Sequence, residues 1–453
     1  MTERSEADEQ RPDAGGQRLT TRETAERLGV KPETVYAYVS RGQLSSSRAP
    51  GGRGSTFDAA EVEALARRTG RREPPSATGE PAVRTGITLI ADDRYYFRGV
   101  DATELATRHT YEEVAEWLWT GELRPGVRFT APAQTVAAAR RAVGALPVHC
   151  GSTDRLRVAV VAAAAADPLR FDLSREAVLG GARSLIPALV AALPTAGGDD
   201  RTGARDLDLS PDPGYGAGAA APGGPATAVG LARQLWPKLT ARKPDEPSLA
   251  ALDTALALLI DHDLAASTLA ARVAASARAH PYAVVSAGLG VLEGPLHGAA
   301  SGLAHRMLAE VLERGGAAPV VADHLRAGRR VPGLGHRLYT GEDPRARTLF
   351  DLLARIPQAG PALAAARDVV ATTARDRTLH ANVDLALAVL SVASDMPAEA
   401  GETVFAIART AGWIAHALEE YGERPLRMRP SGHYTGPRPP QPLPVPRALR
   451  LRE

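Results

Sequence analysis

The strongest constraint on the fold is an apolar period of about 3.6 residues that recurs along most of the chain. This period places apolar side chains on one face of an α-helix, so each repeat predicts a helix. Only two short runs, 87–90 and 94–97, are typical of strands, and they flank an Ala-Asp-Asp turn. The sequence therefore predicts a mostly α fold. The clearest predicted helices are 110–118, 131–146, 155–166, 174–193, 247–261 and 403–421.

Segments rich in proline, glycine and serine divide the 453 residues into regions. Residues 1–17 are polar and lack a period, which predicts a disordered tail. Residues 70–85 predict a linker between a small region, 18–69, and a large region, 86–453. Within the large region, residues 195–228 consist mainly of Gly, Ala, Pro and Asp and predict a flexible insertion.

The charge balance and the cysteine count limit the class of protein. The 54 basic and 52 acidic residues leave a net charge of +2, which argues against a polyanion-binding surface over the whole molecule. The single cysteine excludes an intramolecular disulfide and a multi-cysteine metal site. The first residues lack the apolar stretch of a signal peptide, and the longest apolar run, 158–166, is about half of the ~20 residues that span a bilayer. We therefore expect a cytoplasmic protein without a membrane segment.

Residues 18–69 predict a small helical unit. A capping-box pair, Thr20 and Glu23, marks the start of a first helix. The stretch 31–33, Lys-Pro-Glu, opens a second helix, because proline in the first turn lacks only an amide that would be free anyway. A third amphipathic helix is predicted over 59–68. The apolar side of the second helix is expected to consist of Val35, Tyr36 and Val39.

Between the second and third predicted helices, residues 43–57 are rich in Ser, Gly and Arg and predict a hairpin or wing. Residues 18–72 hold 11 basic and 6 acidic side chains, a net charge of +5. This pattern resembles the winged helix-turn-helix modules of the MerR and excisionase type. The resemblance implies duplex DNA binding, with the second helix in the major groove and wing arginines on phosphates. A protein-interaction module is the alternative. The residues expected to contact DNA are Lys31, Arg41, Arg48 and Arg53.

Three histidines and one aspartate lie where loops meet predicted helices. His262 follows a predicted helix, and His297 lies after a Gly-Pro break where a new helix begins. His336 lies in the glycine-rich stretch VPGLGHRLYTGEDPRA, and Asp384 heads the apolar run that follows NV. These placements indicate an acid–base site without identifying its reaction.

The motifs GPLHG, PGLGHRLYTGEDPRA, NVD and FAIARTAGWIAH resemble the successive signatures of citrate synthases, in the same order. The opening 86–123, which includes YYFRGVDATELA, resembles the start of bacterial members, so the similarity covers about residues 86–440. The resemblance implies a citrate synthase-like fold with a large and a small α-helical domain, the small one at roughly 300–390. It implies a homodimer whose active sites are shared between subunits. The implied reaction condenses acetyl-CoA with oxaloacetate and hydrolyses citryl-CoA to citrate and CoA.

The resemblance also implies roles for individual residues. His297 is expected to polarise the thioester carbonyl, Asp384 to remove the α-proton, and His336 to donate a proton to the ketone of oxaloacetate. Positioned acids and bases suit this chemistry, and arginine binds carboxylates bidentately. No metal or redox cofactor is implied, because the CoA thioester is itself a substrate. The residues expected to hold oxaloacetate are His262, Arg345, Arg409 and, reaching over from the partner subunit, Arg429. The residues expected in the acetyl-CoA pocket are Phe405, Pro332, Gly333, Leu334 and Gly335.

The chain departs from the family pattern at several positions, which leaves the acyl group open. GPLHGAASG lacks the usual Asn and Glu, NVDLALA stands in place of NVDFYSG, and Thr340 stands where a basic residue is often found. One alternative is therefore 2-methylcitrate synthase, which uses propionyl-CoA. Another is a DNA-binding transcription regulator whose synthase-derived domain senses metabolites.

Overall fold

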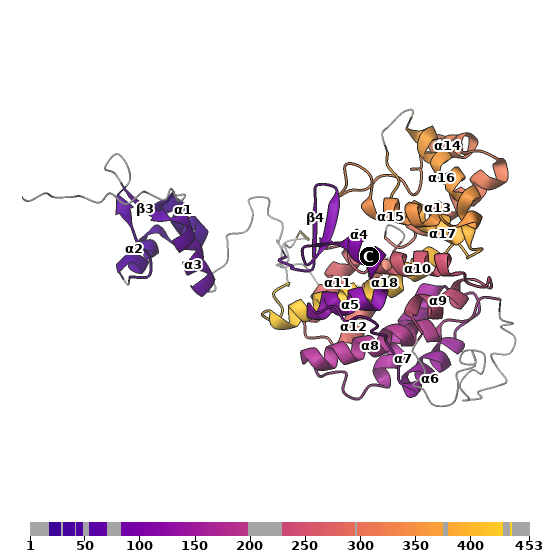
Figure 1. Ribbon diagram of the computed structural model, residues 1–453. Coiled ribbons are helices and arrows are strands. Elements are labelled where there is room, and N and C mark those ends of the chain that lie inside the picture. The colour runs from indigo at the N-terminus through magenta and orange to yellow at the C-terminus, as the bar shows by residue number, and fades with distance from the viewer. Residues whose placement is uncertain are drawn as a thin grey trace, which may run out of the picture. The chain divides into compact units, whose positions relative to one another are not determined.

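The computed structural model describes residues 18–28, 30–40, 42–48, 54–69, 83–197, 229–294, 297–374, 379–428 and 435–436. The chain folds into two compact units, Met1–Arg84 and Thr85–Glu453, each with its own hydrophobic core (Figure 1). The predicted tail, and most of the predicted linker and insertion, lie outside the described residues.

The first unit combines a three-stranded sheet with three helices. Its strands pair antiparallel in the order β1-β3-β2, so β3 is central. The β2–β3 pair confirms the predicted wing. Strand β1 is an addition to the predicted elements, because three residues are too few to show a period. The elements are β1 (Arg18–Thr20), α1 (Thr21–Leu28), α2 (Pro32–Ser40), β2 (Ser47–Arg48), β3 (Ser55–Asp58) and α3 (Ala59–Thr69).

The start of α1 has the predicted capping box. Thr20 N donates to Glu23 Oε2 at 2.7 Å, and Glu23 N donates to Thr20 Oγ1 at 3.3 Å. The predicted apolar side of α2 is wrong at Tyr36, which is 49% exposed, while Val35 and Tyr38 are buried. Residues one and three positions after Val35 point in different directions on a helix, so Tyr38 shares the core face with Val35 and Tyr36 does not. The predicted Val39 is partly buried and packs against the same core. The core of this unit consists of Leu19, Ala25, Leu28, Val35, Tyr38, Leu44, Phe57, Val62 and Leu65.

The second unit begins with an antiparallel sheet of β4 (Thr88–Ala91), β5 (Arg94–Phe97) and β6 (Val100–Asp101). Asp92 and Asp93 form the β4–β5 turn with φ of 52° and 55°, which confirms the predicted strand pair. The helices that follow confirm the mostly α fold. The first of them are α4 (Ala102–Arg108), α5 (Tyr111–Thr120), α6 (Ala133–Gly144), α7 (Ser152–Ala165), α8 (Arg175–Ala192), α9 (Leu231–Leu239), α10 (Glu246–Leu259), α11 (Ala266–Ser276) and α12 (Pro281–Leu292). The remaining ones are α13 (Ala300–Arg314), α14 (Ala317–Arg326), α15 (Pro344–Leu353), a 3₁₀ turn (Pro357–Ala359), α16 (Gly360–Thr373), α17 (Val383–Ala393) and α18 (Ala400–Gly422).

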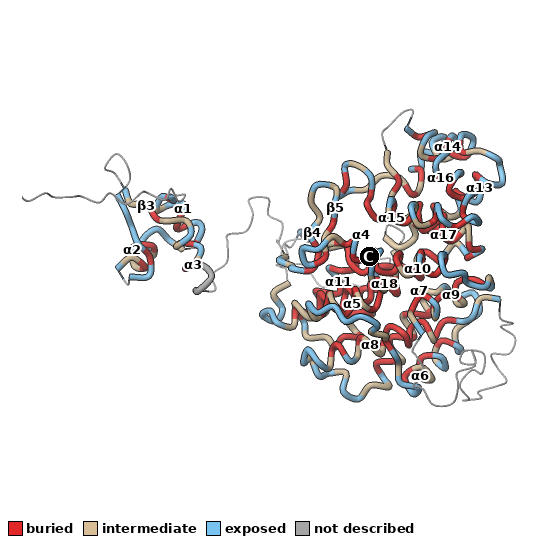
Figure 2. Tube along the Cα trace, viewed as in Figure 1, coloured by how far each residue is buried: buried red, intermediate tan, exposed pale blue. Residues whose placement is uncertain are grey.

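Helix α18 lies at the centre of the second unit and is buried over most of its length (Figure 2). It packs against α5, α8, α10, α11 and α12. Helices α13 to α17 pack mainly on one another, and they occupy residues 300–393. The division of residues 86–453 into a large and a small domain stays a prediction, because this part of the chain forms one compact unit.

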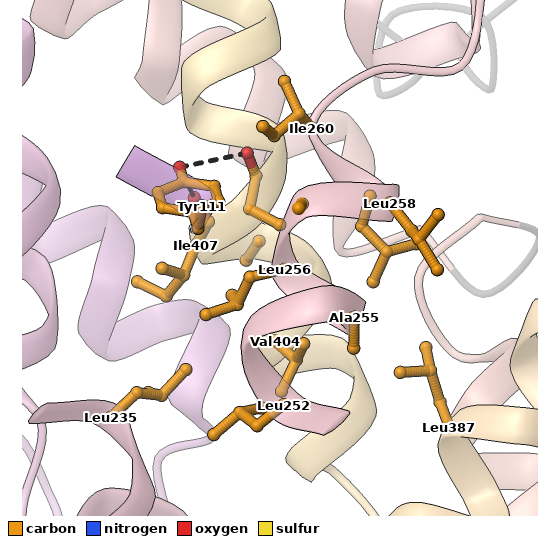
Figure 3. Close-up of a cluster of buried hydrophobic side chains, with 14 of the residues drawn as sticks. Tyr111, Leu235, Leu252, Ala255, Leu256, Leu258, Ile260, Leu387, Val404 and Ile407 are labelled. Carbon is orange, nitrogen blue, oxygen red and sulfur yellow. Dashed lines mark hydrogen bonds between the residues drawn. The ribbon is translucent and has the colours of Figure 1, made fainter. Parts of the chain in front are cut away.

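Figure 3 shows one part of the core, where α10 packs against α18. Leu252 and Leu256 of α10 and Val404 and Ile407 of α18 are buried there. Tyr111 of α5 donates its hydroxyl to the carbonyl of Ile407 at 3.2 Å. This packing fixes the end of α10 against α18, and both helices lead into the candidate site.

Two acidic side chains interact near the start of α9. Glu112 is buried, and its Oε1 accepts the amide of Leu231 at 3.1 Å. Asp253 Oδ2 accepts the amide of Tyr111 at 3.3 Å. Burial, and next the charge of Glu112, raise the pKa of Asp253 to about 7. The folded protein therefore disfavours the ionised form of this carboxyl.

The Asp253 carboxyl should make stability depend on pH. Its folded pKa is raised, so its stabilising contribution is complete below its unfolded pKa, near 4, and is lost as the pH rises through about 7. Asp253→Asn should remove this decline and stabilise the protein at pH 8 by up to roughly 4 kcal/mol, three pKa units at about 1.4 kcal/mol each. Thermal unfolding from pH 4 to pH 8 measures this, with the exposed Glu313→Gln as control. Parallel curves for wild type and Asp253→Asn would contradict the assignment.

Candidate active site

The structure gathers most of the predicted site residues around the end of α10, the loop before α15 and the middle of α18. His262 lies just after α10, and its ring is 5.1 Å from the ring of His336. The ring of His297, just before α13, is 5.9 Å from that of Phe405. The guanidinium of Arg409 lies 4.4 Å from the same Phe405 ring. Residues far apart in the sequence thus form one cluster.

His262 and His336 are linked through Tyr339, which is not among the predicted site residues. His262 Nε2 and Tyr339 Oη are 2.7 Å apart, and the Tyr339 ring is 4.8 Å from the His336 ring. Burial, then the charges of Arg345 and Arg409, hold the pKa of His262 well below its usual range. The setting of His262 therefore favours neutral imidazole.

His336 has a defined tautomer. Its Nδ1 accepts the amide of Leu338 at 3.0 Å, so in the neutral ring the proton lies on Nε2. In this tautomer Nε2 and Nη2 of Arg345, 3.4 Å apart, both carry protons, so this long contact is not a hydrogen bond. Burial and the charge of Arg345 lower the pKa of His336 to about 4. A neutral His336 can donate the Nε2 proton to a substrate oxygen.

Arg345 is held by a buried aspartate that precedes it. Asp343 Oδ1 lies 3.0 Å from Nε of Arg345, and Oδ2 lies 2.8 Å from Nη2. Asp343 Oδ2 also accepts the amide of Val383 at 3.1 Å, which ties the loop to the start of α17. Asp343 is absent from the predicted site, although Asp before Pro is a familiar helix-start signal. The pair fixes the direction of a guanidinium that is only 3% exposed.

Arg409 is the least satisfied cation of the cluster. It is 1% exposed, and its Nε donates to the carbonyl of Leu259 at 2.8 Å. Its Nη1 is buried and has no hydrogen-bond partner among the described residues. Burial lowers the pKa of Arg409 to about 10 against the opposing charge of Asp261. A buried charge without a partner is unfavourable, so this geometry favours an anionic ligand.

His297 is oriented by a serine outside every predicted motif. His297 Nε2 and Ser267 Oγ, at the start of α11, are 2.8 Å apart. Burial, then the charge of Arg409, lower the pKa of His297. A neutral imidazole at this place can donate or accept one hydrogen bond without carrying charge. No local motif marks Ser267, because its partner is 30 residues away.

Asp384 lies in the first turn of α17, where Asn382 Oδ1 accepts its amide at 3.0 Å. Burial raises the pKa of the Asp384 carboxyl to about 6, against the opposing charge of Arg345. A carboxylate with a pKa just below neutrality is mostly ionised at pH 7 and is a better base than an exposed aspartate.

The predicted loop 332–335 runs beside the segment before α17. Gly335 N donates to the carbonyl of His380 at 2.8 Å, and Asn382 N donates to the carbonyl of Gly333 at 3.0 Å. Gly333 has φ of 77°, and a Cβ there would lie 2.7 Å from Cβ of Leu385. Only glycine fits this approach, so the loop and α17 hold each other in place.

The turn that carries His262 is supported by α18 over successive helical turns. A Cβ on Gly412 would lie 2.0 Å from the carbonyl oxygen of Ile260. Asp261 Oδ1 is 3.1 Å from Nε2 of His416, and Oδ2 accepts the Thr88 hydroxyl at 2.5 Å. Both carboxylate oxygens are therefore bonded, which fixes the backbone on the entry side of His262.

His416 acts as a neutral bridge in that support. Its Nδ1 is 2.6 Å from Nη1 of Arg272, and a guanidinium can only donate. The proton of the neutral ring therefore lies on Nε2, which faces Asp261. All three side chains are buried.

The predicted DNA contacts belong to the first unit. Lys31 and Arg48 are both exposed, Lys31 directly before α2 and Arg48 on β2. Tyr36 of α2 is exposed as well. The other predicted DNA contacts, Arg41 and Arg53, and the predicted partner-reaching Arg429 lie outside the described residues.

Two kinds of feature are absent from the described ranges. No group of three or more His, Cys, Asp or Glu side chains there is arranged to hold a metal ion. None of the helices there is long and apolar enough to cross a bilayer.

Both parts of the chain match known families. A family profile described as citrate synthase, C-terminal domain, matches residues 76–431, and a helix-turn-helix domain profile matches residues 18–70. A Mycobacterium tuberculosis protein provisionally named citrate synthase 2 is 38% identical over 205 residues, 44% of this chain and 55% of that protein. The chain thus aligns with about half the length of that relative.

Two other matches are longer. The citrate synthase of Haloferax volcanii is 30% identical over 358 residues, 75% of this chain and 88% of the relative. A solved ternary complex of citrate synthase from Thermoplasma acidophilum with carboxymethyl coenzyme A and oxaloacetate shares the fold. Its TM-score is 0.61 at 21% identity, and the match covers 81% of this chain and 97% of that one.

Proposed function

The chain belongs to the citrate synthase family, and from this premise we propose that it condenses acetyl-CoA with oxaloacetate and hydrolyses citryl-CoA to citrate and CoA. The observation that carries the proposal is the buried Arg409, whose Nη1 has no partner among the described residues. Arg345, also buried, lies beside His336. Two fixed guanidiniums next to neutral histidines match a small dicarboxylate with a ketone to be protonated.

Oxaloacetate would be held by its two carboxylates and its ketone oxygen. Arg409 would bind one carboxylate through Nη1. Arg345, which lies beside His336, would bind the other carboxylate. His262 would hydrogen-bond the substrate from its fixed position beside Tyr339. Arg429 would complete the site from the partner subunit, as the family resemblance implies.

The acyl-CoA half of the reaction would use the remaining residues. Asp384 would remove a proton from the methyl carbon of the thioester, while His297 donates a hydrogen bond to the carbonyl oxygen and stabilises the enolate. The enolate carbon would then attack the oxaloacetate ketone, and the ketone oxygen would take the Nε2 proton of His336. Water would finally hydrolyse the thioester and release CoA. The two histidines would act from the neutral state that their burial favours, and Asp384, with its pKa raised to about 6, would be mostly ionised at pH 7.

The CoA chain would follow the loop 332–335, with Phe405 beside the acetyl group. A cavity of about 360 Å³ borders the segment that pairs with this loop, at His380 and Ala381. Apolar side chains, Phe350 among them, line part of the cavity, together with two arginines, Arg347 and Arg367, and two acidic side chains, Glu342 and Asp351. Because this partly apolar cavity lies beside the segment paired with the loop and its arginines would be available to phosphates, we assign the nucleotide end of CoA to it.

Thiol release from acetyl-CoA, with and without oxaloacetate, tests the proposed reaction. We expect release that depends on oxaloacetate, with citrate as product. Propionyl-CoA measured in parallel tests the alternative, 2-methylcitrate synthase. This alternative is suggested by the residues after Asp384, which differ from the family pattern. Release from neither thioester by folded protein that binds oxaloacetate would refute the enzyme and support a metabolite sensor.

We further propose that the first unit binds duplex DNA. Three exposed side chains support this: Tyr36 lies on α2, Lys31 directly before it, and Arg48 on the wing. These are the positions that face DNA in winged helix-turn-helix modules. The test is a gel shift of the full chain with a random duplex pool at low salt, where electrostatic affinity is greatest. Lys31→Glu with Arg48→Glu should abolish a shift, and no shift by wild type would refute DNA binding.

We also propose that the protein is a homodimer, as the family resemblance implies. A groove lined by Val161 of α7 and Tyr282 of α12 lies near three strongly exposed apolar side chains. Exposed apolar groups gathered in one place are typical of a protein interface. These side chains are Val161, Leu169 and Phe171, exposed by 62%, 73% and 67%. Sedimentation should give twice the chain mass of 47.5 kDa, and a monomer would refute the shared site.

A further inference from the structure

The turn between β4 and β5 is tied to the loop that carries His336. Asp93 at this turn accepts three hydrogen bonds from two residues of the loop. Thr340 donates its amide to Oδ1 at 2.7 Å and its hydroxyl to Oδ2 at 2.9 Å, and Gly341 N donates to Oδ2 at 3.0 Å. Both carboxylate oxygens are therefore used, across a separation of 247 residues in the sequence.

The two sides of this contact are matched in backbone shape. Asp93 has φ of 55°, a left-handed conformation that aspartate tolerates better than most residues. A Cβ on Gly341 would lie 3.0 Å from Asp93 Oδ2, so a side chain there would require the carboxylate to shift by a few tenths of an ångström. The contact thus suits an aspartate on one side and a glycine on the other.

The same two segments line a common cavity. The cavity, of about 410 Å³, lies between the β4–β5 turn, with Asp92 and Tyr95 in its lining, and the start of α15, with Glu342 and Arg347. Across this space the hydrogen bonds to Asp93 join the two segments. The carboxylate is therefore the main described link between the turn and residues 340–341.

This link lies one residue from Tyr339, which packs against His336 in the candidate active site. Thr340 directly follows Tyr339, whose ring lies 4.8 Å from the ring of His336. Tyr339 is buried, so it transmits a shift of the loop to the histidine it packs against. The backbone beside His262 has its own support from Asp261 and α18, while the His262 ring also contacts Tyr339.

We infer that Asp93 is a positioning residue for His336, which it acts on through Thr340 and Tyr339. In the kinetic test this inference rests on the proposed function. Asp93 holds residues 336–341 against the β4–β5 turn, so that the Nε2 proton of His336 faces the ketone oxygen. Thr340, which stands where a basic residue is often found, fastens the loop through its amide and hydroxyl.

The kinetic test compares Asp93→Ala with Asp92→Ala, a change in the same turn. We expect Asp93→Ala to lower kcat about tenfold, with the oxaloacetate KM changed less than threefold, because Arg409 keeps its bond to Leu259 and α18 still supports the backbone beside His262. Thr340→Ala should lower kcat by less, because it removes only the hydroxyl bond to Asp93 and keeps the amide bond. The double variant should match Asp93→Ala, because the Thr340 hydroxyl has already lost its partner there. Asp92→Ala should behave as wild type. An unchanged kcat, or a loss explained by a lower unfolding midpoint, would overturn the inference.

A second readout needs no catalysis. Arg337 is exposed in the loop, one residue after His336, and trypsin cleaves after arginine. Releasing the loop should raise the initial rate of cleavage after Arg337, measured by mass spectrometry, at least fivefold in Asp93→Ala and leave it unchanged in Asp92→Ala. If wild type proves inactive and this contrast is still found, the proposed function fails while the anchoring by Asp93 stands. Equal cleavage in wild type and Asp93→Ala would overturn the anchoring itself.

Discussion

Asp384→Ala should lower turnover by about a thousandfold, within the range that a positioned general base contributes. The α-proton of a thioester is weakly acidic, and no other described carboxylate is proposed for this step. Binding of oxaloacetate should survive, because Asp384 is not among the groups proposed to hold it. Thiol release and oxaloacetate titration calorimetry measure the two effects, with exposed Glu313→Ala as control. Unchanged turnover would refute the assigned base.

The pH dependence of the wild type gives a second check on Asp384. Its raised pKa of about 6 means that the carboxylate forms as the pH rises through this value. The rate should therefore rise with pH through about 6 and level off above 7. A rate that is flat between pH 5 and pH 7 would contradict Asp384 as the base.

Arg409→Met should raise the oxaloacetate KM about 100-fold, equivalent to roughly 3 kcal/mol of charge-assisted hydrogen bonding. Methionine fills part of the same space but cannot pair with a carboxylate. Arg409→Lys should recover little, because an ammonium lacks the planar fork. Oxaloacetate titration measures the loss, with exposed Arg233→Met as control.

The stability of the Arg409 variant separates a ligand-binding role from a structural one. In the free protein this buried cation has an unpartnered nitrogen among the described residues, so its removal should not lower the unfolding midpoint. Weak oxaloacetate binding together with a midpoint near that of wild type is the expected pair of results. A midpoint lowered by many degrees, with affinity retained, would show that Arg409 serves only the fold.

The fold and the main site residues could be predicted from the sequence because each carries a local signal. The helical period marks the helices, and the loop positions of His297 and His336 stand out within recognisable motifs. The partners of these residues carry no such signal. Ser267 and Asp93 come from distant segments, and Tyr339, although it lies in the same motif as His336, pairs with the distant His262. The sequence does not show these pairings.

The error on α2 has a similar origin. Tyr36 and Tyr38 are equally apolar in the sequence, and only the direction set by Val35 shows which of them is buried. The choice between them depends on how α2 packs against the rest of the unit. Sequence periodicity over nine residues is too short to settle it.

The placement of Lys31 gives amine-reactive labelling an unusual selectivity in this protein. The chain has three lysines, Lys31, Lys238 and Lys243. Lys31 is exposed directly before α2, whereas Lys238 on α9 donates to Thr195 at 3.2 Å. An acylating reagent therefore marks the helix-turn-helix unit at a single lysine, with two internal references in the second unit. Loss of labelling at Lys31 alone would footprint whatever covers α2, in a mixture and without purification of the complex.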